Sequence, residues 1–157
     1  MVNNLLFRDY LFKFYLNASH YVIINGTKGP VHSHTWEFSL TIAVTVDNFK
    51  QFNVFEKAIS EYVKPYQNTV LNNISPFDLN VPTLENITEQ FGDKFRSIIS
   101  NIGGELIRID GSETPTRSYG IDFSNDSEFI TRIGKQSAES INSIIEKLIK
   151  GTTDENR

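Results

Sequence analysis

The sequence predicts an α+β fold in which an antiparallel sheet carries two helices, with the element order ββααββ and a further helix near the C-terminus. Three observations support this prediction. Period-two alternation of apolar residues indicates long strands in the first part of the chain, and apolar residues at three- and four-residue spacing indicate helices in the middle. Two short β-rich segments then follow a pair of glycines. A length of 157 residues suits one domain with its own core.

The first two strands are predicted to pair as a hairpin. Aromatic, aliphatic and β-branched residues dominate residues 5 to about 22, where their alternation indicates a long strand. The segment INGTKGP at residues 24–30 is dense in Gly, Asn and Pro and predicts a loop. The following HSHTWEFSLTIAVTV predicts a second long strand that ends at Val46.

An amphipathic helix is predicted next. Asp47 and Asn48 offer a break and a helix start. Pro65 either kinks this helix or ends it, because a proline inside a helix removes a hydrogen bond and clashes with the preceding turn. The apolar residues at three- and four-residue spacing are Phe52, Phe55, Ile59, Tyr62, Val63 and Tyr66.

A second helix is predicted after the loop ISPFDLNVPT at residues 74–83. Thr83 is a good N-cap, and Glu85 falls in the first turn, where a negative charge suits the helix dipole. The apolar positions of this helix are Leu84, Ile87, Phe91, Phe95, Ile98 and Ile99.

The last part of the predicted sheet follows Gly103 and Gly104, where ELIRID and RSYGIDF indicate two shorter strands joined by GSETPT. Residues 137–150 predict a final helix, and GTTDENR is expected to be a frayed tail. We therefore expect one domain at residues 1–135 and a C-terminal helix with its tail at residues 136–157. The final helix has on one side Ile141, Ile144, Ile145, Leu148 and Ile149.

Composition excludes several classes of function. A net charge of -4 argues against binding to nucleic acids or anionic membranes, since no basic run offsets the repulsion. The absence of Cys excludes disulfides, thiolate nucleophiles and sulfur-ligated metals, and it suits a reducing compartment, so we expect a cytoplasmic protein. The apolar N-terminal segment is broken by Arg8, Asp9 and Lys13, which suits a strand better than a signal peptide.

All three histidines fall within NASHYVIINGTKGPVHSHTW at residues 17–36. Successive strand residues point to opposite faces, so His32 and His34 project from one face and can share a ligand. If the intervening loop returns the chain antiparallel, His20 lies across from them on that face. Three neutral imidazoles with an open fourth position are typical of catalytic zinc, so we expect Zn²⁺ that faces a substrate.

Two other interpretations of the histidines stay open. They could be polar surface residues of a hairpin, or core residues that are each satisfied by one hydrogen bond. The His-x-His pair alone does not decide between these and a metal site, whereas the third histidine across a predicted hairpin favours the metal.

The motifs NASHYV, the glycine-rich loop, HSHTWEFSLTIAV, VPTLENI and SETPTRSYGIDF occur in this order between about residue 12 and residue 123. Together they resemble the 6-pyruvoyl-tetrahydropterin synthase and 6-carboxy-tetrahydropterin synthase family. The resemblance implies the tunnelling fold, an antiparallel four-stranded sheet with two helices on one face. It also implies a homo-oligomer, either a trimer whose sheets join into a barrel or a hexamer of two stacked trimers.

The resemblance implies roles for individual residues as well. His20, His32 and His34 would bind zinc, and Glu113, with Thr114 beside it, would hold a pterin-like small molecule. A carboxylate can accept two parallel hydrogen bonds from the ring N–H and amino groups of a pterin, which orients the ring. Without the resemblance, Glu113 would be interpreted as a solvated turn residue.

The departures from the family pattern concern the acid-base groups. Where the synthases have a cysteine, this loop contains Thr27 and Lys28, and Gln67 and Asn68 stand where an Asp-His pair is expected. These amides cannot relay protons at neutral pH. Lys28 could act as a base if desolvation beside a cation lowered its pKa, and a solvated surface lysine is the alternative. Some relatives use a glutamate, but Glu37 is predicted by strand parity to face away from the metal.

These features predict a zinc-binding protein of this family that acts on or binds a reduced pterin of the dihydroneopterin type, with altered or lost synthase chemistry. If active, it would be a zinc-dependent lyase. The alternative is a non-catalytic paralogue that binds a pterin-like ligand or serves in assembly. A third hypothesis is an oligomeric scaffold with structural zinc, whose C-terminal helix carries a partner contact. Glu113 together with the three histidines argues against a bare scaffold, because neither is needed to close a barrel.

Overall fold

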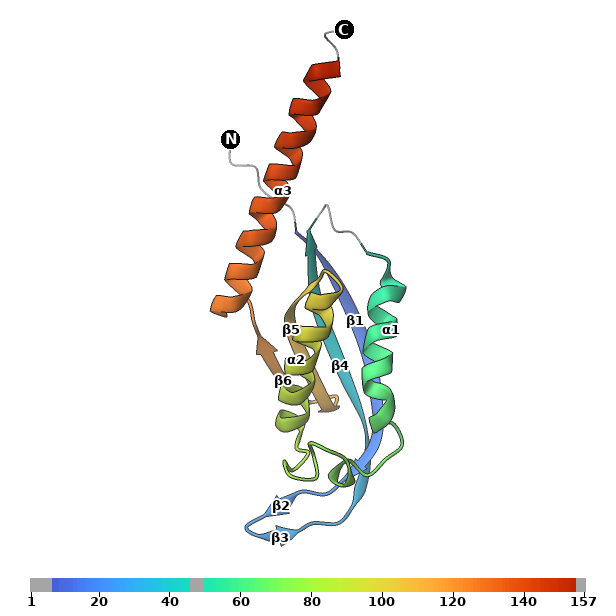
Figure 1. Ribbon diagram of the computed structural model, residues 1–157. Helices are drawn as coiled ribbons and strands as arrows, with labels where there is room; N and C mark the ends of the chain where they lie inside the picture. Colours follow the sequence, from blue (N-terminus) through green and yellow to red (C-terminus); the bar gives the residue numbers. More distant parts are fainter. Residues whose placement is uncertain (1–6, 46–49, 155–157) are drawn as a thin grey trace.

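The chain, described by a computed structural model over residues 7–45 and 50–154, forms a four-stranded antiparallel sheet in the order β1-β4-β5-β6 with two helices on one face (Figure 1). This arrangement confirms the predicted α+β fold and its ββααββ order. The helix start expected at Asp47 and Asn48 lies outside the described residues. The main elements are β1 (Phe7–His20), β4 (His32–Thr45), α1 (Phe52–Val63), α2 (Leu84–Asn101), β5 (Glu105–Thr114) and β6 (Arg117–Asp122).

β1 and β4 pair along their whole length, from Phe7 opposite Thr45 to His20 opposite His32. Their side chains alternate between a face covered by the helices and an open face, as the period-two pattern predicts. His20 is on the covered face together with the fully buried Trp36 of β4. The histidines therefore lie at the end of the apolar, helix-covered face of the sheet.

The segment between β1 and β4 differs from the predicted loop, because it contains a small hairpin of β2 (Ile23–Ile24) and β3 (Thr27–Lys28). Asn25 and Gly26 at its tip have positive φ values of 49° and 77°. Positive φ at both central residues is the geometry of a type I′ turn, for which Asn-Gly is a preferred pair. The hairpin extends the β1–β4 ribbon beyond the main sheet (Figure 1).

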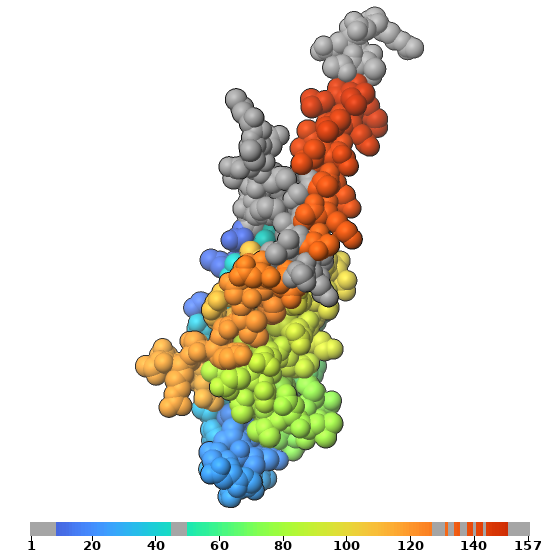
Figure 2. Space-filling model, turned by 90° about the vertical axis from the view of Figure 1, so that its left-hand side faces the viewer, coloured from blue at the N-terminus to red at the C-terminus, as the bar shows by residue number. Residues whose placement is uncertain are grey.

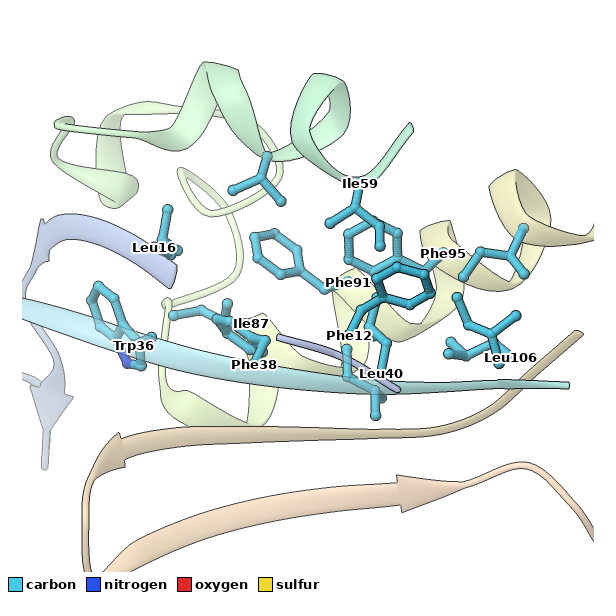
Figure 3. Packing of buried hydrophobic residues seen from close by; sticks show 14 of the residues in the cluster. Phe12, Leu16, Trp36, Phe38, Leu40, Ile59, Ile87, Phe91, Phe95 and Leu106 are labelled. Carbon is cyan, nitrogen blue, oxygen red and sulfur yellow. The ribbon is translucent and has the colours of Figure 1, made fainter. Parts of the chain in front are cut away.

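The core lies between the sheet and the two helices, and aromatic rings dominate it (Figure 3). The residues of α1 that are buried in this core are Phe55, Ile59 and Val63. At its centre lies Phe91 of α2, which is fully buried. Its ring lies 5.2 to 6.5 Å, centroid to centroid, from those of Phe14, Phe38, Tyr62, Tyr66, Phe77 and Phe95.

Helix boundaries in this region follow local sequence signals. α1 ends at Val63 and passes into a 3-10 turn, η2 (Lys64–Tyr66), so Pro65 ends the α-helix rather than kinking it. Thr83 caps α2 as predicted, since its side-chain oxygen accepts a hydrogen bond from the Asn86 backbone N–H at 3.3 Å. A second 3-10 turn, η3 (Leu71–Asn73), lies between them.

β5 is longer than predicted, because most of the expected connection GSETPT belongs to the strand and only Pro115 and Thr116 form the turn into β6. The strand passes close beneath α2 at Gly111, where a Cβ atom would collide with the side chains of Thr88 and Phe38. The missing side chain allows the helix to pack directly on the sheet.

The C-terminal helix α3 (Ser127–Asp154) begins at Ser127, not at residue 137 as predicted, and continues into the expected tail. The predicted boundary between residues 135 and 136 thus falls inside the helix. Gly134 does not end it, since a glycine within a helix costs only about 1 kcal/mol relative to alanine. Figure 1 shows α3 projecting beyond the end of the sheet, and Figure 2 shows the later part of this helix, in orange-red, standing out from the rest of the molecule. Residues 155–157 lie outside the described part of the chain.

The aliphatic stripe predicted for the last helix is present on α3, and its side chains are exposed. They are Ile141, Ile144, Ile145, Leu148 and Ile149. Among the described residues, no helix combines the length and apolar character needed to cross a membrane.

Candidate metal centre

The three histidines meet at the hairpin end of the β1–β4 ribbon. His20 lies directly opposite His32, and His34 is one pleat further along β4. Their ring centroids are 4.6 Å (His20–His32), 5.1 Å (His20–His34) and 4.8 Å (His32–His34) apart. One ring nitrogen from each lies within 4.8 Å of the others, so a single ion could bind all three.

Two backbone carbonyls determine which nitrogen of two of these rings carries the proton. Nδ1–H of the buried His20 donates to the Pro82 carbonyl at 2.6 Å, and Nδ1–H of His32 donates to the Pro30 carbonyl at 3.0 Å. A carbonyl oxygen can only accept, so Nδ1 is protonated and Nε2 of each neutral ring has a free lone pair. Such a hydrogen bond behind the ring is typical of metal-binding histidines.

The two unprotonated nitrogens face each other. Nε2 of His20 and Nε2 of His32 are 3.1 Å apart, and two lone pairs at this distance repel unless a cation or a proton lies between them. Nε2 of His34 is buried and forms no hydrogen bond with any described residue. Because a buried nitrogen without a hydrogen bond is costly, and because two facing lone pairs repel, the arrangement fits a metal ion better than three individually satisfied histidines.

Glu113 approaches the histidines from β5. The pairing of β5 with β6 shifts between Ser112 and Thr114, which leaves Glu113 as the extra residue of a β-bulge. Its Oε1 is 3.3 Å from Nε2 of His34 and 3.6 Å from Nε2 of His20. At this position the carboxylate can contact a metal ion or accept a hydrogen bond from a group bound to it.

A pocket of about 450 Å³ opens beside the histidines. The buried Trp36 packs against two of the histidines, with its ring centroid 4.9 Å from that of His20 and 5.0 Å from that of His34. Glu113 and Thr114, the two predicted ligand-binding residues, both border this space. Besides these and the histidines, the lining residues are Val22, Thr116 and Arg117.

Burial lowers the pKa of two of the histidines. For His20 desolvation is the largest cause and outweighs the hydrogen bond to the Pro82 carbonyl, which raises its pKa. For His34 desolvation again lowers the pKa, and the nearby Glu113 carboxylate opposes it. Both rings therefore favour the neutral form, which is the form that binds metals.

We expect the metal-free protein to lose stability as the pH falls through 6.5, the ordinary pKa of histidine. Below this pH the unfolded chain binds protons at His20 and His34 that the folded chain excludes, so acid favours unfolding. Above it, this contribution to stability is complete. Denaturation of chelator-treated protein on both sides of this pH measures the effect, and NMR titration of the rings assigns it. Raised pKa values for both rings would contradict this prediction.

Two charged residues considered as bases lie away from the histidine cluster. Lys28 is exposed on β3, and its Nζ lies 4.0 Å from the centre of the Tyr21 ring in a cation–π contact. It is not among the residues that line the pocket. Glu37 faces the open side of the sheet, as strand parity predicts, where it accepts hydrogen bonds from Lys13 at 2.8 Å and Tyr15 at 3.2 Å.

Gln67 and Asn68, which stand where the resemblance places an Asp-His pair, hold the edge strand β1. The side-chain oxygen of Gln67 accepts from the Asn17 N–H at 2.9 Å, and its amide donates to the Tyr15 carbonyl at 2.7 Å. Asn68 has a positive φ of 58°, and its backbone N–H donates to the Asn17 carbonyl at 2.6 Å. These contacts satisfy backbone groups that an edge strand leaves unpaired.

Several contributors to the site were not predicted. The carbonyls of Pro30 and Pro82 carry no sequence signal, because every residue has a carbonyl. Trp36 could have been found, since the alternation that places His34 on the covered face places Trp36 there too. Arg117 lies within a motif already singled out, but its place in the pocket depends on the pairing of β5 with β6.

The fold and the site define a class of α+β protein in which a β-hairpin presents three imidazoles, able to hold a metal ion, beside a sheet covered by helices on one face. The model of the 6-pyruvoyl tetrahydropterin synthase family matches residues 10–123, and the chain belongs to this family. The match ends before α3. Comparison with the curated proteins gave no match.

Solved structures share the fold. The 6-pyruvoyl tetrahydropterin synthase of Caenorhabditis elegans matches with a TM-score of 0.66 and 16% identity, over 75% of this chain and 96% of its own. The 6-pyruvoyl tetrahydropterin synthase of Plasmodium falciparum matches with a TM-score of 0.54 and 14% identity, over 73% of this chain and 96% of its own. An uncharacterized protein from Wolinella succinogenes matches with a TM-score of 0.56 and 12% identity, over 74% of this chain and 98% of its own. These likenesses confirm the tunnelling fold of the subunit.

Proposed function

We propose that this chain is a zinc-binding, 6-pyruvoyl/6-carboxy-tetrahydropterin synthase-like protein that acts on or binds a reduced pterin of the dihydroneopterin type. Its synthase chemistry is altered or lost. The observation that carries the proposal is the pair of Nε2 atoms of His20 and His32, which face each other at 3.1 Å. Membership of a family named for pterin synthesis supplies the class of ligand.

Zinc suits the donor set of this site. Three neutral imidazoles without a thiolate would occupy three positions and leave one open to a ligand. The hydrogen bonds from His20 and His32 to backbone carbonyls hold both rings with their Nε2 atoms facing each other, so that both atoms would be available to the ion. When bound, zinc supplies a Lewis acid that polarises an oxygen of the ligand.

Glu113 and Thr114 are the residues that we expect to contact the ligand. Both border the pocket, and the Glu113 carboxylate lies 3.3 Å from Nε2 of His34. There it accepts hydrogen bonds from ligand N–H or O–H groups, which orients the bound molecule. In a catalytic version Lys28 is the candidate base, and it would have to exchange its contact with Tyr21 for one with the ligand.

The loss of the standard chemistry is supported by the residues that replace its acid-base groups. Neither Thr27 nor Lys28 offers a thiol, and both atoms of the Gln67 amide are bonded to the backbone of β1. An amide also does not titrate at neutral pH. These contacts favour, as the alternative function, a non-catalytic paralogue that binds a pterin-like ligand or takes part in assembly.

We also propose that the chain forms a homo-oligomer, a trimer or a hexamer. β1 and β6 are the edges of the sheet, and a groove of about 480 Å³ runs between β1 and α1. The groove is lined partly by apolar side chains, including Leu11, Phe14 and Phe52. Pairing of edges between copies removes exposed strand edges. Light scattering that gave a monomeric mass would contradict this.

We expect purified protein to contain zinc and to bind dihydroneopterin triphosphate without brisk conversion to a pyruvoyl or carboxy pterin. The physical reason is that no thiol or Asp-His pair is available to move the protons. Mass spectrometry of the incubation products tests this, with the Caenorhabditis elegans synthase as a positive control.

The possible outcomes separate the hypotheses. Brisk synthase turnover would overturn the claim of altered chemistry. Cleavage of the pterin side chain would favour a lyase, whereas binding without any product would favour the non-catalytic paralogue. Protein that carries no stoichiometric metal and binds no pterin would contradict the proposed function itself.

A further inference from the structure

Arg117, the first residue of β6, places a cation at the rim of the metal pocket. Other arginines near the sheet are paired: Arg96 lies 3.2 Å from Asp126, and Arg108 lies 2.7 Å from Asp110. Arg117 is exposed, and within residues 7–45 and 50–154 it forms no ion pair. Its guanidinium is therefore available to a ligand.

The bulge at Glu113 explains why Arg117 has no ion pair. Ser112 pairs with Ser118, so a regular ladder would next pair Glu113 with Arg117. Opposite charges directly across an antiparallel ladder attract each other and would be mutually satisfied. The extra residue instead places Thr114 opposite Arg117, while the Glu113 carboxylate turns to the histidines. Two opposite charges are thus kept apart at the border of one pocket.

Hydroxyl groups accompany the guanidinium. Oγ1 of Thr114 and Oγ1 of Thr116 are 3.3 Å apart, and both residues line the pocket together with Arg117. A planar guanidinium with neighbouring hydroxyl donors suits the oxygens of a phosphate or a carboxylate. The whole chain has a net charge of -4, which repels anions, so an anionic ligand needs a local cation of this kind.

We propose that Arg117, assisted by Thr114 and Thr116, is the residue that binds the anionic group of the ligand in the metal pocket, and that it sets the preference of this pocket for anionic over neutral ligands. The inference rests on the proposed function, since it concerns the charged end of a ligand whose other contacts are the metal and Glu113. With Zn²⁺ bound, the ion, Glu113 and Arg117 together leave two positive charges in excess, which an anionic ligand balances.

Calorimetric titration of the full-length, zinc-loaded protein tests the inference with three ligands: neutral 7,8-dihydroneopterin, its triphosphate, and 6-carboxypterin. The wild-type protein is expected to bind an anionic ligand more tightly than the neutral one. Arg117→Gln should lower the affinity for the preferred anionic ligand about 10- to 100-fold and change the affinity for the neutral ligand less than about threefold. Whether the triphosphate or the carboxypterin loses affinity distinguishes a phosphate from a carboxylate.

The controls separate this role from a general effect of charge. Lys94→Gln removes the same charge from an exposed position on α2, outside the pocket lining, and is expected to leave all three affinities unchanged. Arg117→Lys keeps the charge but not the planar fork, so an intermediate loss is expected. Zinc content and the midpoint of denaturation, unchanged in Arg117→Gln, show that the metal site and the fold are intact.

Three results would overturn the inference. The wild-type protein could bind the neutral pterin as tightly as the anionic ones, or Arg117→Gln could keep the full preference for an anion. Loss of the preference in Lys28→Gln, with the preference kept in Arg117→Gln, would assign the anion to Lys28. If the wild-type protein binds none of the three ligands, the proposed function fails together with this inference, whereas the first three results leave that function standing.

Discussion

Replacing His32 with alanine is expected to reduce the bound metal from about one ion per chain to a small fraction of that value. The variant removes the Nε2 atom that faces Nε2 of His20 at 3.1 Å and leaves two imidazoles in the site. Loss of a group that only orients a ligand costs about 10- to 100-fold in metal affinity, so loss of a ligand itself should cost at least about 100-fold. Elemental analysis of protein purified without chelator measures the effect.

Ser33→Ala is the matched control for this experiment. Ser33 is the neighbour of His32 on β4, points to the opposite face, and shares a hydrogen bond with Ser19 at 2.8 Å. The Ser33→Ala variant is expected to have the same metal content as the wild-type protein. His32 is exposed, so its replacement disturbs the core little and both variants can be compared at the same folded fraction. Full metal content in His32→Ala would contradict the metal centre.

The second large effect is expected in the core, where Phe91→Ala should lower the free energy of unfolding by about 3 to 5 kcal/mol. Phe91 is fully buried at the centre of the aromatic cluster between α2 and the sheet. Removal of the ring loses its packing contacts and leaves a cavity, which the stiff neighbouring rings cannot fill by small shifts. Denaturation by urea, followed by circular dichroism, measures the loss.

Two variants bracket this prediction. Phe91→Leu keeps much of the buried volume and is expected to cost clearly less than the alanine. Leu79→Ala removes an apolar side chain that is 92% exposed, and its effect should stay within about 0.5 kcal/mol. A loss in Phe91→Ala no larger than that of Leu79→Ala would show that the cluster does not form the core.

Features that depend on local spacing could be predicted from the sequence. Alternation along β1 and β4 indicates the buried face, and the antiparallel return then brings His20 opposite His32. Thr83 was identifiable because an N-cap is a contact between residues three apart. Pro65 was known to disturb α1, although the pattern alone left open whether the helix would kink or end.

Features that depend on the pairing of distant segments were missed or misplaced. The bulge at Glu113 arises from the register of β5 against β6, which spacing within one strand does not reveal. The start of α3 was misplaced because a helix tolerates Gly134 in its interior. The turn at Asn25 and Gly26, in contrast, is a local feature that could have been predicted. Asn-Gly is a hairpin signal, but the Gly, Asn and Pro content of the whole segment led to the prediction of a loop.

The hydrogen bond from His20 to the Pro82 carbonyl has a consequence for folding. His20 and His32 are 12 residues apart along the chain, so closing the loop between them costs little entropy, whereas Pro82 is 62 residues from His20. A chain that is not yet folded can therefore gather the imidazoles around an ion before that carbonyl arrives to fix the tautomer of His20. If the denatured chain binds the ion in this way, metal should stabilise the native protein by less than the affinity of the finished site implies.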